Sequence, residues 1–497
     1  MELGSVKHFL KGKTILVTGA TVFVEKVLRV QPDVKKLYLL LRASNPCSAT
    51  ERMQNEIIGK DLFRVLRDEL GDDVGSFISE KVIAVAGDVS LENLGIKYAN
   101  LRKDMLEEID IVLHSAASTK FDERFDVAMR INTIGAFHVL NFAKNCTKVV
   151  ILLHVSTAYM GRESEGLISE EPFQVGETLN GFSKLDMDFE KKLVEKKLHE
   201  LRAQNSKEET ITSEMRSFGL DEEDLVLIML HTCVAKKHGW PNTYAFTKAM
   251  AEMLVEHKKE NLPVVILRPT IVTSTYKEPF PGWVEGVRTV DSCAIAYCKR
   301  KLSCLPGNIK AAIDVIPADM VVNALIVAMV ASASKCYNNI YHVGSSMRNP
   351  LKYINILDYF YKYFTKVPWM DKNGKPIKVG TITMLDMAGF KRYIFIHYLL
   401  PLKGFKLLNT VCCQHFQKRC LDFNRKIQVA MRLVNLYRPY LFFNGGVFDD
   451  RNMEKVEMAA KQGGVEMDLF YFDPKMIDWE DYFMNVHFPG MVKCLIK

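Results

Sequence analysis

Tyr244 and Lys248 stand four residues apart in the chain. On a helix, two residues at this spacing share one face, so the sequence predicts a phenol beside an ammonium group. The ammonium would lower the pKa of the phenol, normally about 10, towards the range of a good proton donor. Upstream, Ser156 and Thr157 follow an apolar, strand-like run and offer two hydroxyl groups. Hydroxyl, phenol and ammonium together predict a proton relay.

A nucleotide-binding segment precedes this relay near the start of the chain. The run 13–21 is rich in β-branched residues and contains Thr-Gly near its end, which predicts a buried parallel strand followed by a turn. A helix expected over Val22–Val30 would point its N-terminus at the pyrophosphate of a dinucleotide. Gly19, Ala20 and Thr21 are therefore expected to hold the cofactor. The next glycine is Gly59, so the usual glycine-rich motif of such a turn is incomplete.

Three further strands are expected, over 36–43, 82–88 and 109–117. Arg42 ends the first of them, and a cation there favours the extra phosphate of NADP over NAD. Asp88 ends the second and could cap the adenine amine, while Ala116 ends the third and leaves room for a cofactor. Asn132 follows on a helix. This order of elements predicts an α/β fold with a Rossmann-like, doubly wound parallel sheet.

The composition is typical of an intracellular protein with a large core. Of 497 residues, 48% are hydrophobic and 25% are charged, which is enough for one large or two medium domains. Neither a signal peptide, nor a transit peptide, nor an apolar run of about 18 residues is recognisable. We therefore expect a cytoplasm-facing chain without a transmembrane helix. The eleven cysteines lack paired ligand spacing, so reduced thiols and no metal site are expected.

An insertion over about 165–238 departs from the simple α/β pattern. It separates the two hydroxyls from Tyr244 by more residues than a connection between a strand and a helix needs. Its segment 189–201 is dense in Lys and Glu, with apolar residues at helical spacing. The pattern predicts a charged helical insertion, either a solvated surface helix or a cap over a long substrate.

A basic region follows Ile340–Gly344, the last strand that is expected for the first domain. From Arg348 to Arg438 there are 17 Lys or Arg residues against 4 Asp or Glu, and aromatic residues are interleaved among them. This pattern is typical of an ordinary helical domain with a basic face, of contact with an anionic lipid surface, or of a site for a phosphate-bearing substrate tail. No nucleic-acid-binding module is recognisable, so nucleic acid is not an expected partner.

The chain resembles the plant-type fatty acyl-coenzyme A reductases, or male-sterility family, which are extended short-chain dehydrogenase/reductases. The resemblance is carried by Thr14–Thr21, Lys36–Ala43, Gly87–Ser90, His114–Ala117, His154–Tyr159, Gly239–Lys248, Leu267–Thr270, Asp314–Asp319 and Phe472–Tyr482. The Gly-Trp-Pro-Asn-x-Tyr string and the C-terminal segment are its most specific parts. It implies an NADP-binding extended reductase domain over 1–345 and a smaller, mainly helical C-terminal domain over 346–497.

The resemblance also implies a reaction, in which long-chain acyl-CoA and NADPH give a primary fatty alcohol through an aldehyde. Tyr244 and Thr157 would stabilise the oxyanion, and Tyr244 would then protonate the alkoxide. Lys248 would hold the nicotinamide ribose. By analogy Thr157 is better placed than Ser156, although the sequence cannot separate adjacent hydroxyls. The implied setting is lipid biosynthesis, as of wax or suberin, with peripheral contact at the endoplasmic reticulum.

One departure from the family pattern falls in the cofactor turn. Relatives carry Gly-Phe-Leu-Ala-Lys where Thr21 here runs directly into Val22. We expect the following helix either to begin more than a turn late or to slide towards Gly19 and rotate apolar residues out of the core. Both outcomes predict weak NADPH binding. Two alternatives therefore stay open: a family member with impaired catalysis, and an extended reductase that acts on another carbonyl or alcohol.

Overall fold

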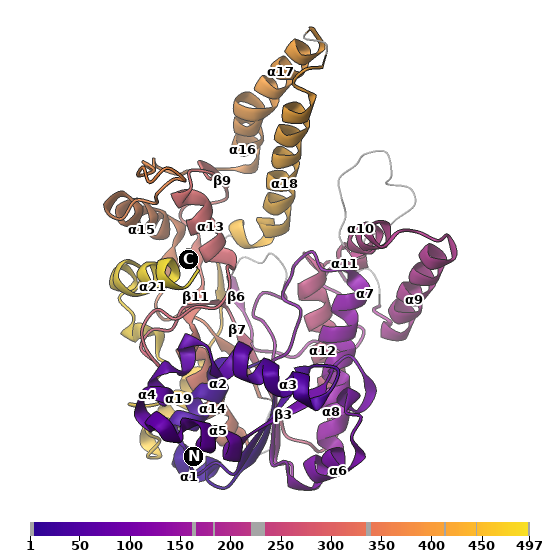
Figure 1. Ribbon diagram of the computed structural model, residues 1–497, viewed down its shortest axis with the longest axis vertical. Coiled ribbons are helices and arrows are strands. Elements are labelled where there is room, and N and C mark those ends of the chain that lie inside the picture. The colour runs from indigo at the N-terminus through magenta and orange to yellow at the C-terminus, as the bar shows by residue number, and fades with distance from the viewer. Residues whose placement is uncertain are drawn as a thin grey trace.

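A seven-stranded parallel sheet forms the centre of the protein (Figure 1). The computed structural model describes residues 4–161, 166–181, 184–219, 234–333, 339–411, 414–443 and 445–495. In spatial order the strands are β12 (Asn339–Val343), β7 (Val264–Pro269), β5 (Ile151–Val155), β4 (Ile111–His114), β1 (Thr14–Thr18), β2 (Lys36–Arg42) and β3 (Val82–Gly87). They are short, mostly apolar runs, because helices cover both faces of a parallel sheet.

The chain leaves β1 towards β2 and β3 on one side, and then returns to build β4, β5, β7 and β12 on the other. Ligands of doubly wound sheets bind at such a reversal, beyond the carboxyl ends of the strands. The carboxyl ends of β1 and β4, where the chain reverses direction, are thus where the fold itself places a cofactor. The predicted α/β class and the order of its strands are confirmed.

Two groups of helices sandwich the sheet. One face is covered by α1 (Val6–Leu10), α2 (Thr21–Val30) and α14 (Ala318–Ser332), and the other by α6 (Ala99–Glu108), α8 (Gly135–Asn145) and α12 (Thr243–Lys258). The connection from β2 to β3 holds α3 (Pro46–Met53), η1 (Gln54–Ile58), η2 (Asp61–Phe63), α4 (Arg64–Leu70), η3 (Gly71–Asp73) and α5 (Val74–Lys81). Shorter turns are η4 (Glu92–Gly95), α7 (Phe125–Ala128) and η5 (Met129–Ile134).

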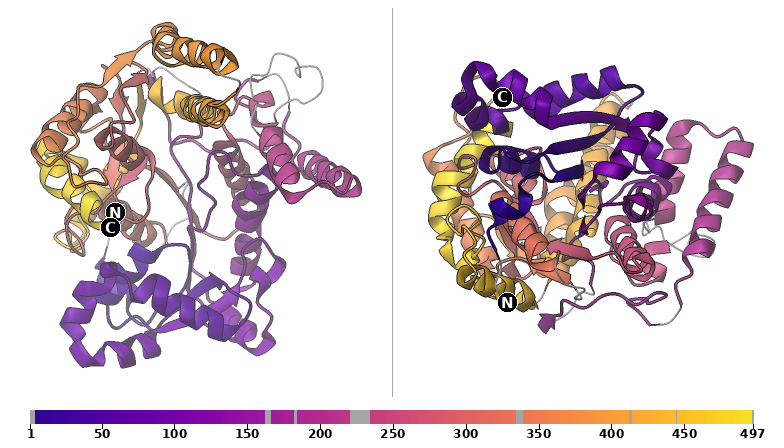
Figure 2. Two further views of the ribbon diagram at one scale, coloured as in Figure 1. Left: turned by 45° about the horizontal axis from the view of Figure 1, so that its top comes forward. Right: turned by 90° about the horizontal axis from the view of Figure 1, so that it is seen from below.

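The predicted insertion forms a small helical unit on one side of the sheet (Figures 1 and 2). Its described helices are α9 (Met187–Ala203), α10 (Glu208–Gly219) and α11 (Val234–Lys237). Apolar residues of α9 and α10, among them Val194 and Met215, share a core with Phe246 and Met250 of α12. The charged insertion therefore supports the helix that carries the predicted phenol and ammonium.

The C-terminal region is mainly helical, as predicted, and extends the core of the sheet domain. It contains α15 (Tyr353–Lys366), α16 (Met387–Ile394), η6 (Phe395–Leu399), α17 (Leu400–Val411), α18 (Gln417–Leu441), α19 (Arg451–Gln462), η7 (Pro474–Met476), α20 (Trp479–Asp481), η8 (Tyr482–His487) and α21 (Phe488–Leu495). The segment before it contributes α13 (Thr289–Cys298). Small two-stranded sheets pair β10 (Ala312–Ile313) with β13 (Leu351–Lys352), β11 (Val315–Pro317) with β8 (Ile271–Thr273), β14 (Thr383–Leu385) with β9 (Cys304–Pro306), and β15 (Gly446–Phe448) with β6 (Gly166–Ile168).

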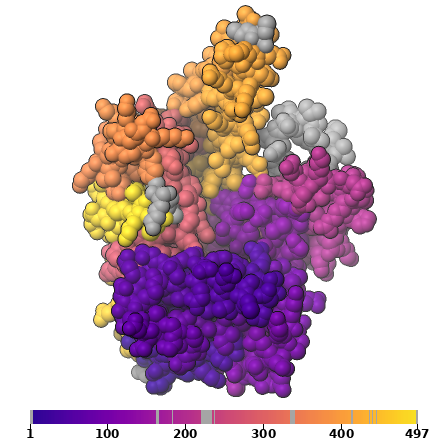
Figure 3. All heavy atoms as spheres, viewed as in Figure 1, coloured from indigo at the N-terminus to yellow at the C-terminus, as the bar shows by residue number. Residues whose placement is uncertain are grey.

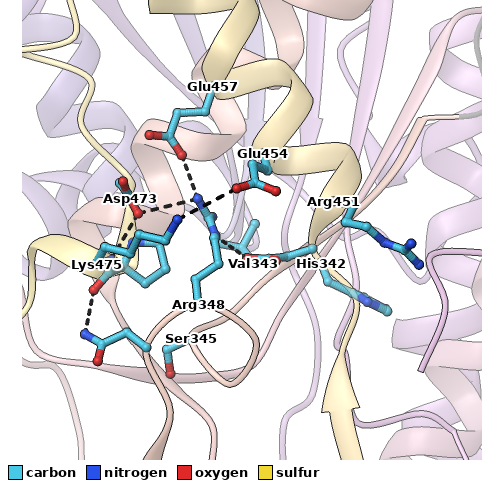
Figure 4. A network of polar contacts seen from close by, with 12 residues as sticks. His342, Val343, Ser345, Arg348, Arg451, Glu454, Glu457, Asp473 and Lys475 are labelled. Carbon is cyan, nitrogen blue, oxygen red and sulfur yellow. Dashed lines mark hydrogen bonds and ion pairs between the residues drawn. The ribbon is translucent and has the colours of Figure 1, made fainter. Parts of the chain in front are cut away.

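A buried ion network fixes this region to the end of the sheet (Figure 4). Arg348 follows β12 and bonds the carboxylates of Asp450 and Glu457 at 2.7 Å each, with Asp473 at 3.5 Å. Removing one partner of a buried ion pair is costly, since the remaining charge stays desolvated. The network therefore holds α19 and the C-terminal segment in one position against β12.

Candidate active site

Helix α12 places Tyr244 and Lys248 one turn apart, as predicted. Its start is fixed by Asn242, whose side chain accepts a hydrogen bond from the Ala245 N–H at 2.8 Å. The helix is held from behind by Asn132, which donates to the Thr247 hydroxyl at 3.0 Å. The phenol and the ammonium are thus carried by a helix that is anchored at its start and along its length.

The structure separates the two adjacent hydroxyls after β5. The Thr157 hydroxyl lies close enough to the Tyr244 phenol to lower the pKa of that phenol. The Ser156 hydroxyl is instead directed to the sulfur of Met160, at 3.4 Å. Only the Thr157 hydroxyl therefore lies beside the phenol in a position to share a reacting oxygen.

Lys248 is buried below this pair, with its ammonium group donating to the carbonyl oxygen of Val155 at 2.6 Å. Burial lowers the pKa of Lys248 to about 8, against the opposing effect of Glu252. The side chain is thus still mostly charged at neutral pH, and it is fixed to the end of β5.

The expected lowering of the Tyr244 pKa does not occur in this structure. Burial raises the pKa of Tyr244 to about 12, and the nearby Thr157 hydroxyl opposes that rise only in part. The Lys248 ammonium is directed to Val155 and not to the phenol. A phenol with this pKa is fully protonated at neutral pH, which a group that gives its proton to an alkoxide needs to be.

The cofactor turn follows β1 as predicted, and Gly19 is required there. Its φ is +73°, and a Cβ at this position would lie 2.7 Å from the backbone N and Cα of Ala116. Ala116 in turn bonds the Thr18 hydroxyl through its N–H at 3.3 Å. The ends of β1 and β4 are therefore in direct contact at the turn, which leaves no space for a larger residue.

Helix α2 begins at Thr21, with Ala20 as its N-cap, and no side chain caps its first N–H groups. The expected late start of the helix is thus wrong, and so is the expected exit of apolar residues from the core, although the helix does lie close to Gly19 as the second outcome required. The helix does not begin late, and Phe23, Val24, Val27 and Leu28 all remain buried. The shortened connection instead draws the helix directly against the turn.

In this position of α2, charged side chains of the helix are buried as well as apolar ones. Glu25 and Lys26 are both buried, in a network with Arg29 and with Glu278 of a distant loop. Burial raises the pKa of Glu25 and lowers that of Lys26. Because nearly all sides of α2 are buried, its apolar residues stay in the core whichever way the helix is turned.

A pocket of about 230 Å³ opens beside the turn. Its lining, among the described residues, includes Gly19, Ala20 and Thr21 with the ends of β1 and β2, and two cations, Arg52 and Lys60. Free N–H groups at a helix N-terminus and nearby cations are the donors that phosphate groups need. The residues present therefore fit the phosphates of a dinucleotide.

Arg52 and Lys60 were missed by the sequence analysis, although both lie shortly after the strand that it identified. They are paired with Glu56 and Glu285, which line the same pocket. Arg42 ends β2 with an exposed side chain, and its backbone oxygen accepts a bond from Arg52. Arg42 is not among the lining residues.

Asp88 and Asn132 are both engaged in local structure. The Asp88 carboxylate accepts the Ser90 N–H at 2.8 Å, and it too is absent from the lining of the pocket. The Asn132 amide clamps the backbone of Ser118, accepting its N–H at 2.8 Å and donating to its carbonyl oxygen at 3.1 Å. The structure thus gives Asn132 the task of joining the loop after β4 to α12.

An aromatic wall made of Phe121, Tyr437 and Tyr440 stands beside Tyr244 and was also missed. The ring of Phe121 lies 5.7 Å from that of Tyr244 and stacks on Tyr440 at 5.0 Å. Tyr437 meets Phe121 edge-on at 5.3 Å. Tyr437 and Tyr440 end α18, so the C-terminal region completes the surroundings of the phenol. A cluster of aromatic residues almost 200 positions away carries no local signal of this contact.

No group of three or more potential ligands could hold a metal ion among the described residues. No helix within the described ranges is both long and apolar enough to cross a membrane.

This sheet, its turn and its Thr-Tyr-Lys constellation define a reductase of the extended short-chain type. Two family models, both described as male sterility protein, match residues 17–325 and 397–497, the first of them an NAD-binding domain. The chain is 50% identical over the full length of both proteins to an alcohol-forming fatty acyl-CoA reductase of Simmondsia chinensis. It is 48% identical, again over both full lengths, to fatty acyl-CoA reductase 1 of Arabidopsis thaliana. The chain therefore belongs to the plant fatty acyl-CoA reductase family.

Solved structures support the fold at greater distance. The terminal R domain of the myxalamid PKS-NRPS pathway superposes with a TM-score of 0.53 at 17% identity, covering 94% of this chain and 90% of that one. The reductase domain of a nonribosomal peptide synthetase from Mycobacterium tuberculosis gives 0.52 at 16% identity, covering 99% and 94%. The two alternatives left open by the sequence are not favoured by these comparisons.

Proposed function

We propose that this chain reduces long-chain acyl-CoA to a primary fatty alcohol in two steps, with NADPH as the reductant. The relatives at about half identity are fatty acyl-CoA reductases, and they match this chain from end to end. The observation that carries the assignment is the grouping of the Thr157 hydroxyl, the Tyr244 phenol and the buried Lys248 ammonium after the end of β5, at the carboxyl edge of the sheet.

In each step, bound NADPH supplies a hydride to the carbonyl carbon. The Tyr244 and Thr157 hydroxyls would donate hydrogen bonds to the carbonyl oxygen as negative charge develops on it. In the first step the carbon–sulfur bond then breaks, and the coenzyme A thiolate leaves an aldehyde. In the second step the Tyr244 hydroxyl would pass its proton to the alkoxide. Overall, one acyl-CoA, two NADPH and two protons give one alcohol, free coenzyme A and two NADP⁺.

Lys248 would act through position and charge. Its ammonium is fixed at the end of β5, where the carboxyl edge of the sheet would meet the nicotinamide ribose. Gly19, Ala20 and Thr21 would hold the pyrophosphate, and Arg52 and Lys60 of the same pocket, with Arg42 as the alternative, would bind the ribose 2′-phosphate.

We also propose that the reaction takes place at a membrane surface. The excess of Lys and Arg over 348–438 supports reversible contact with an anionic membrane surface, such as the cytoplasmic face of the endoplasmic reticulum. Such contact would bring the enzyme to the place where long acyl chains are concentrated.

The test is NADPH oxidation by the purified chain with saturated acyl-CoA substrates, with alcohol and aldehyde measured by chromatography. We expect alcohol formation with two NADPH consumed per product, and its loss in Tyr244→Phe while NADPH binding is retained. Reduction in Tyr244→Phe at near the parental rate would refute the assigned role of the phenol. No product from any acyl-CoA, despite NADPH binding, would refute the function.

A further inference from the structure

A helical hairpin made of α16, η6, α17 and α18 (Met387–Leu441) rises out of the body of the protein (Figures 1 and 3). Its base is fixed at both ends. At one end β14 pairs with β9, and at the other the Tyr440 hydroxyl accepts a bond from Asn242. The far part, around the end of α17 and the start of α18, stands clear of the sheet domain.

The hairpin holds itself together with only one side of α17. Leu402 and Asn409 are buried, and the side chain of Asn409 bonds Gln417 at 2.9 Å and the Phe416 N–H at 2.7 Å. The Cys420 thiol, also buried, is directed to the carbonyl oxygen of Phe405. These contacts close the hairpin, and they leave the rest of α17 to the solvent.

The face of α17 that remains free is the apolar one. Leu400, Leu407, Leu408 and Val411 lie at the spacing i, i+7, i+8 and i+11, which is the pattern of a helix face that normally packs against a core. Here these side chains are 52%, 73%, 61% and 77% exposed. Leu421, at the start of α18 on the neighbouring helix, is 58% exposed. Exposed apolar residues this close together indicate a surface that is covered by a partner.

The charge of the hairpin indicates what that partner is. Met387–Leu441 contains ten Lys or Arg residues and a single acidic one, Asp422. Lys403, Lys406, Lys418 and Arg419 flank the exposed apolar face, and their side chains are themselves exposed. Lysine and arginine at the edge of an apolar face are typical of helices that lie in an anionic lipid interface. A second copy of the hairpin would bring two strongly positive surfaces together, which argues against self-association.

We infer that this hairpin is the membrane-docking element of the protein, with the apolar face of α17 entering the interface of an anionic bilayer. The inference deepens the proposed membrane contact and rests on it: it assigns the contact to one hairpin and adds apolar insertion to charge attraction. A helix of 25 residues spans about 37 Å, so α18 separates the docked tip from Tyr440 and the reaction site by roughly that distance.

The test is co-sedimentation of the full chain with vesicles of phosphatidylcholine alone, or of phosphatidylcholine with about one third phosphatidylserine. The variant Leu407→Ser/Leu408→Ser/Val411→Ser removes the apolar face. The variant Lys403→Gln/Lys406→Gln/Lys418→Gln/Arg419→Gln removes its flanking charge. The matched control Val175→Ser/Met458→Ser/Met476→Ser changes three exposed apolar residues elsewhere.

We expect the parent and the control to bind the anionic vesicles equally. The apolar variant should bind at least about tenfold more weakly at every salt concentration, because partial burial of three such side chains is lost. The charge variant should lose roughly fivefold for each charge at low salt and much less at high salt. Parental binding by the apolar variant would overturn the inference, as would the absence of binding to either kind of vesicle.

Light scattering and a turnover assay without vesicles distinguish membrane docking from dimerisation and from failure of the proposed function. Light scattering that shows a dimer in the parent and a monomer in the apolar variant would assign the face to a second copy and overturn the inference. Turnover of a medium-chain acyl-CoA in vesicle-free buffer should be the same in parent and apolar variant. If the parent lacks this turnover but binds vesicles as expected, the proposed function fails while the docking hairpin stands.

Discussion

Asn242 donates a hydrogen bond from its side-chain amide to the Tyr440 hydroxyl across 3.2 Å, and both residues are buried. Asn242 caps the helix that carries Tyr244 and Lys248, and Tyr440 ends the long helix of the C-terminal hairpin. This single contact therefore joins the start of the catalytic helix to a segment almost 200 residues further along the chain. It makes the C-terminal region part of the site.

Replacing Tyr440 should separate the effect of its hydroxyl, which bonds Asn242, from that of its ring, which stacks on Phe121. Tyr440→Phe keeps the ring stacked on Phe121 and leaves the Asn242 amide unpaired, which should cost about 1–3 kcal/mol of stability. Tyr440→Ala also removes one of the three rings of the aromatic wall, and we expect a higher KM for acyl-CoA with an unchanged Kd for NADPH. Steady-state kinetics and thermal unfolding measure both effects. Tyr361→Phe, on an exposed ring of α15, is the control, and equal KM values in all three variants would show that the wall does not contact substrate.

The two hydroxyls after β5 should differ in their effect on turnover. Thr157→Val removes the hydroxyl beside Tyr244 and should lower kcat by about 10²–10³, the usual cost of a lost oxyanion donor. Ser156→Ala should change kcat by less than about threefold, because that hydroxyl is directed to Met160. Comparable losses in the two variants would mean that Ser156 turns towards the substrate during the reaction.

Turnover should fall as the pH rises through about 8, the pKa to which burial lowers Lys248. The proposed role needs the protonated ammonium, which is present below that pKa and lost above it. A pH profile of kcat/KM measures this, and Lys248→Arg should shift the alkaline limb to higher pH, since arginine does not deprotonate in this range. An alkaline limb that stays in place in Lys248→Arg would belong to another group.

The free energy of unfolding should also depend on the protonation of Lys248, but it should rise with pH where turnover falls. The pKa of Lys248 is about 8 in the folded protein and ordinarily 10.5, so the unfolded chain binds more protons between these two values. Unfolding free energy should therefore rise with pH across this window. Denaturant unfolding of the parent and of Lys248→Met, in which this contribution is absent, isolates the effect. A parallel pH dependence in both proteins would contradict the assignment.

Selectivity for NADPH should depend on the cations of the pocket beside the turn. Arg52→Ala should raise the Kd for NADPH by about tenfold or more, the value of a lost charge-assisted bond, with little change for NADH. Arg42→Ala is the comparison, and a smaller effect is expected because its side chain is not among those that line the pocket. Fluorescence titration of the parent and the two variants with both cofactors gives the six dissociation constants. A larger effect of Arg42→Ala would place the 2′-phosphate at the end of β2 instead.

Restoring Gly-Phe-Leu-Ala-Lys between Thr21 and Val22 should tighten NADPH binding. The insertion adds the second glycine of the turn, where the β-branched Val22 now follows Thr21, and close backbone approach to phosphate favours glycine. It should also release Glu25 and Lys26 from their buried network, which a change in the hydrogen exchange of α2 would report. Unchanged NADPH affinity would show that the shortened turn already holds the cofactor as well as the longer one.

The sequence by itself determined the elements and their order. Strands β1, β2, β3, β4 and β12, the helix with Tyr244 and Lys248, and the amphipathic helix of the insertion all follow from local patterns of apolar residues and turns. Such patterns can be recognised because a buried strand is formed by consecutive apolar residues and a helix face by regularly spaced ones. The family was likewise readable from short motifs, since those motifs are contiguous.

Only the tertiary structure decided how these elements meet. It directed Thr157 and not Ser156 to the phenol, brought Tyr440 beside the start of α12, and raised the pKa of Tyr244 where the sequence had predicted a fall. It also drew α2 against Gly19 at the cost of burying Glu25 and Lys26. Each of these outcomes depends on desolvation and on contacts between segments far apart in the chain. Desolvation and long-range contacts cannot be inferred from the residues that are neighbours in the sequence.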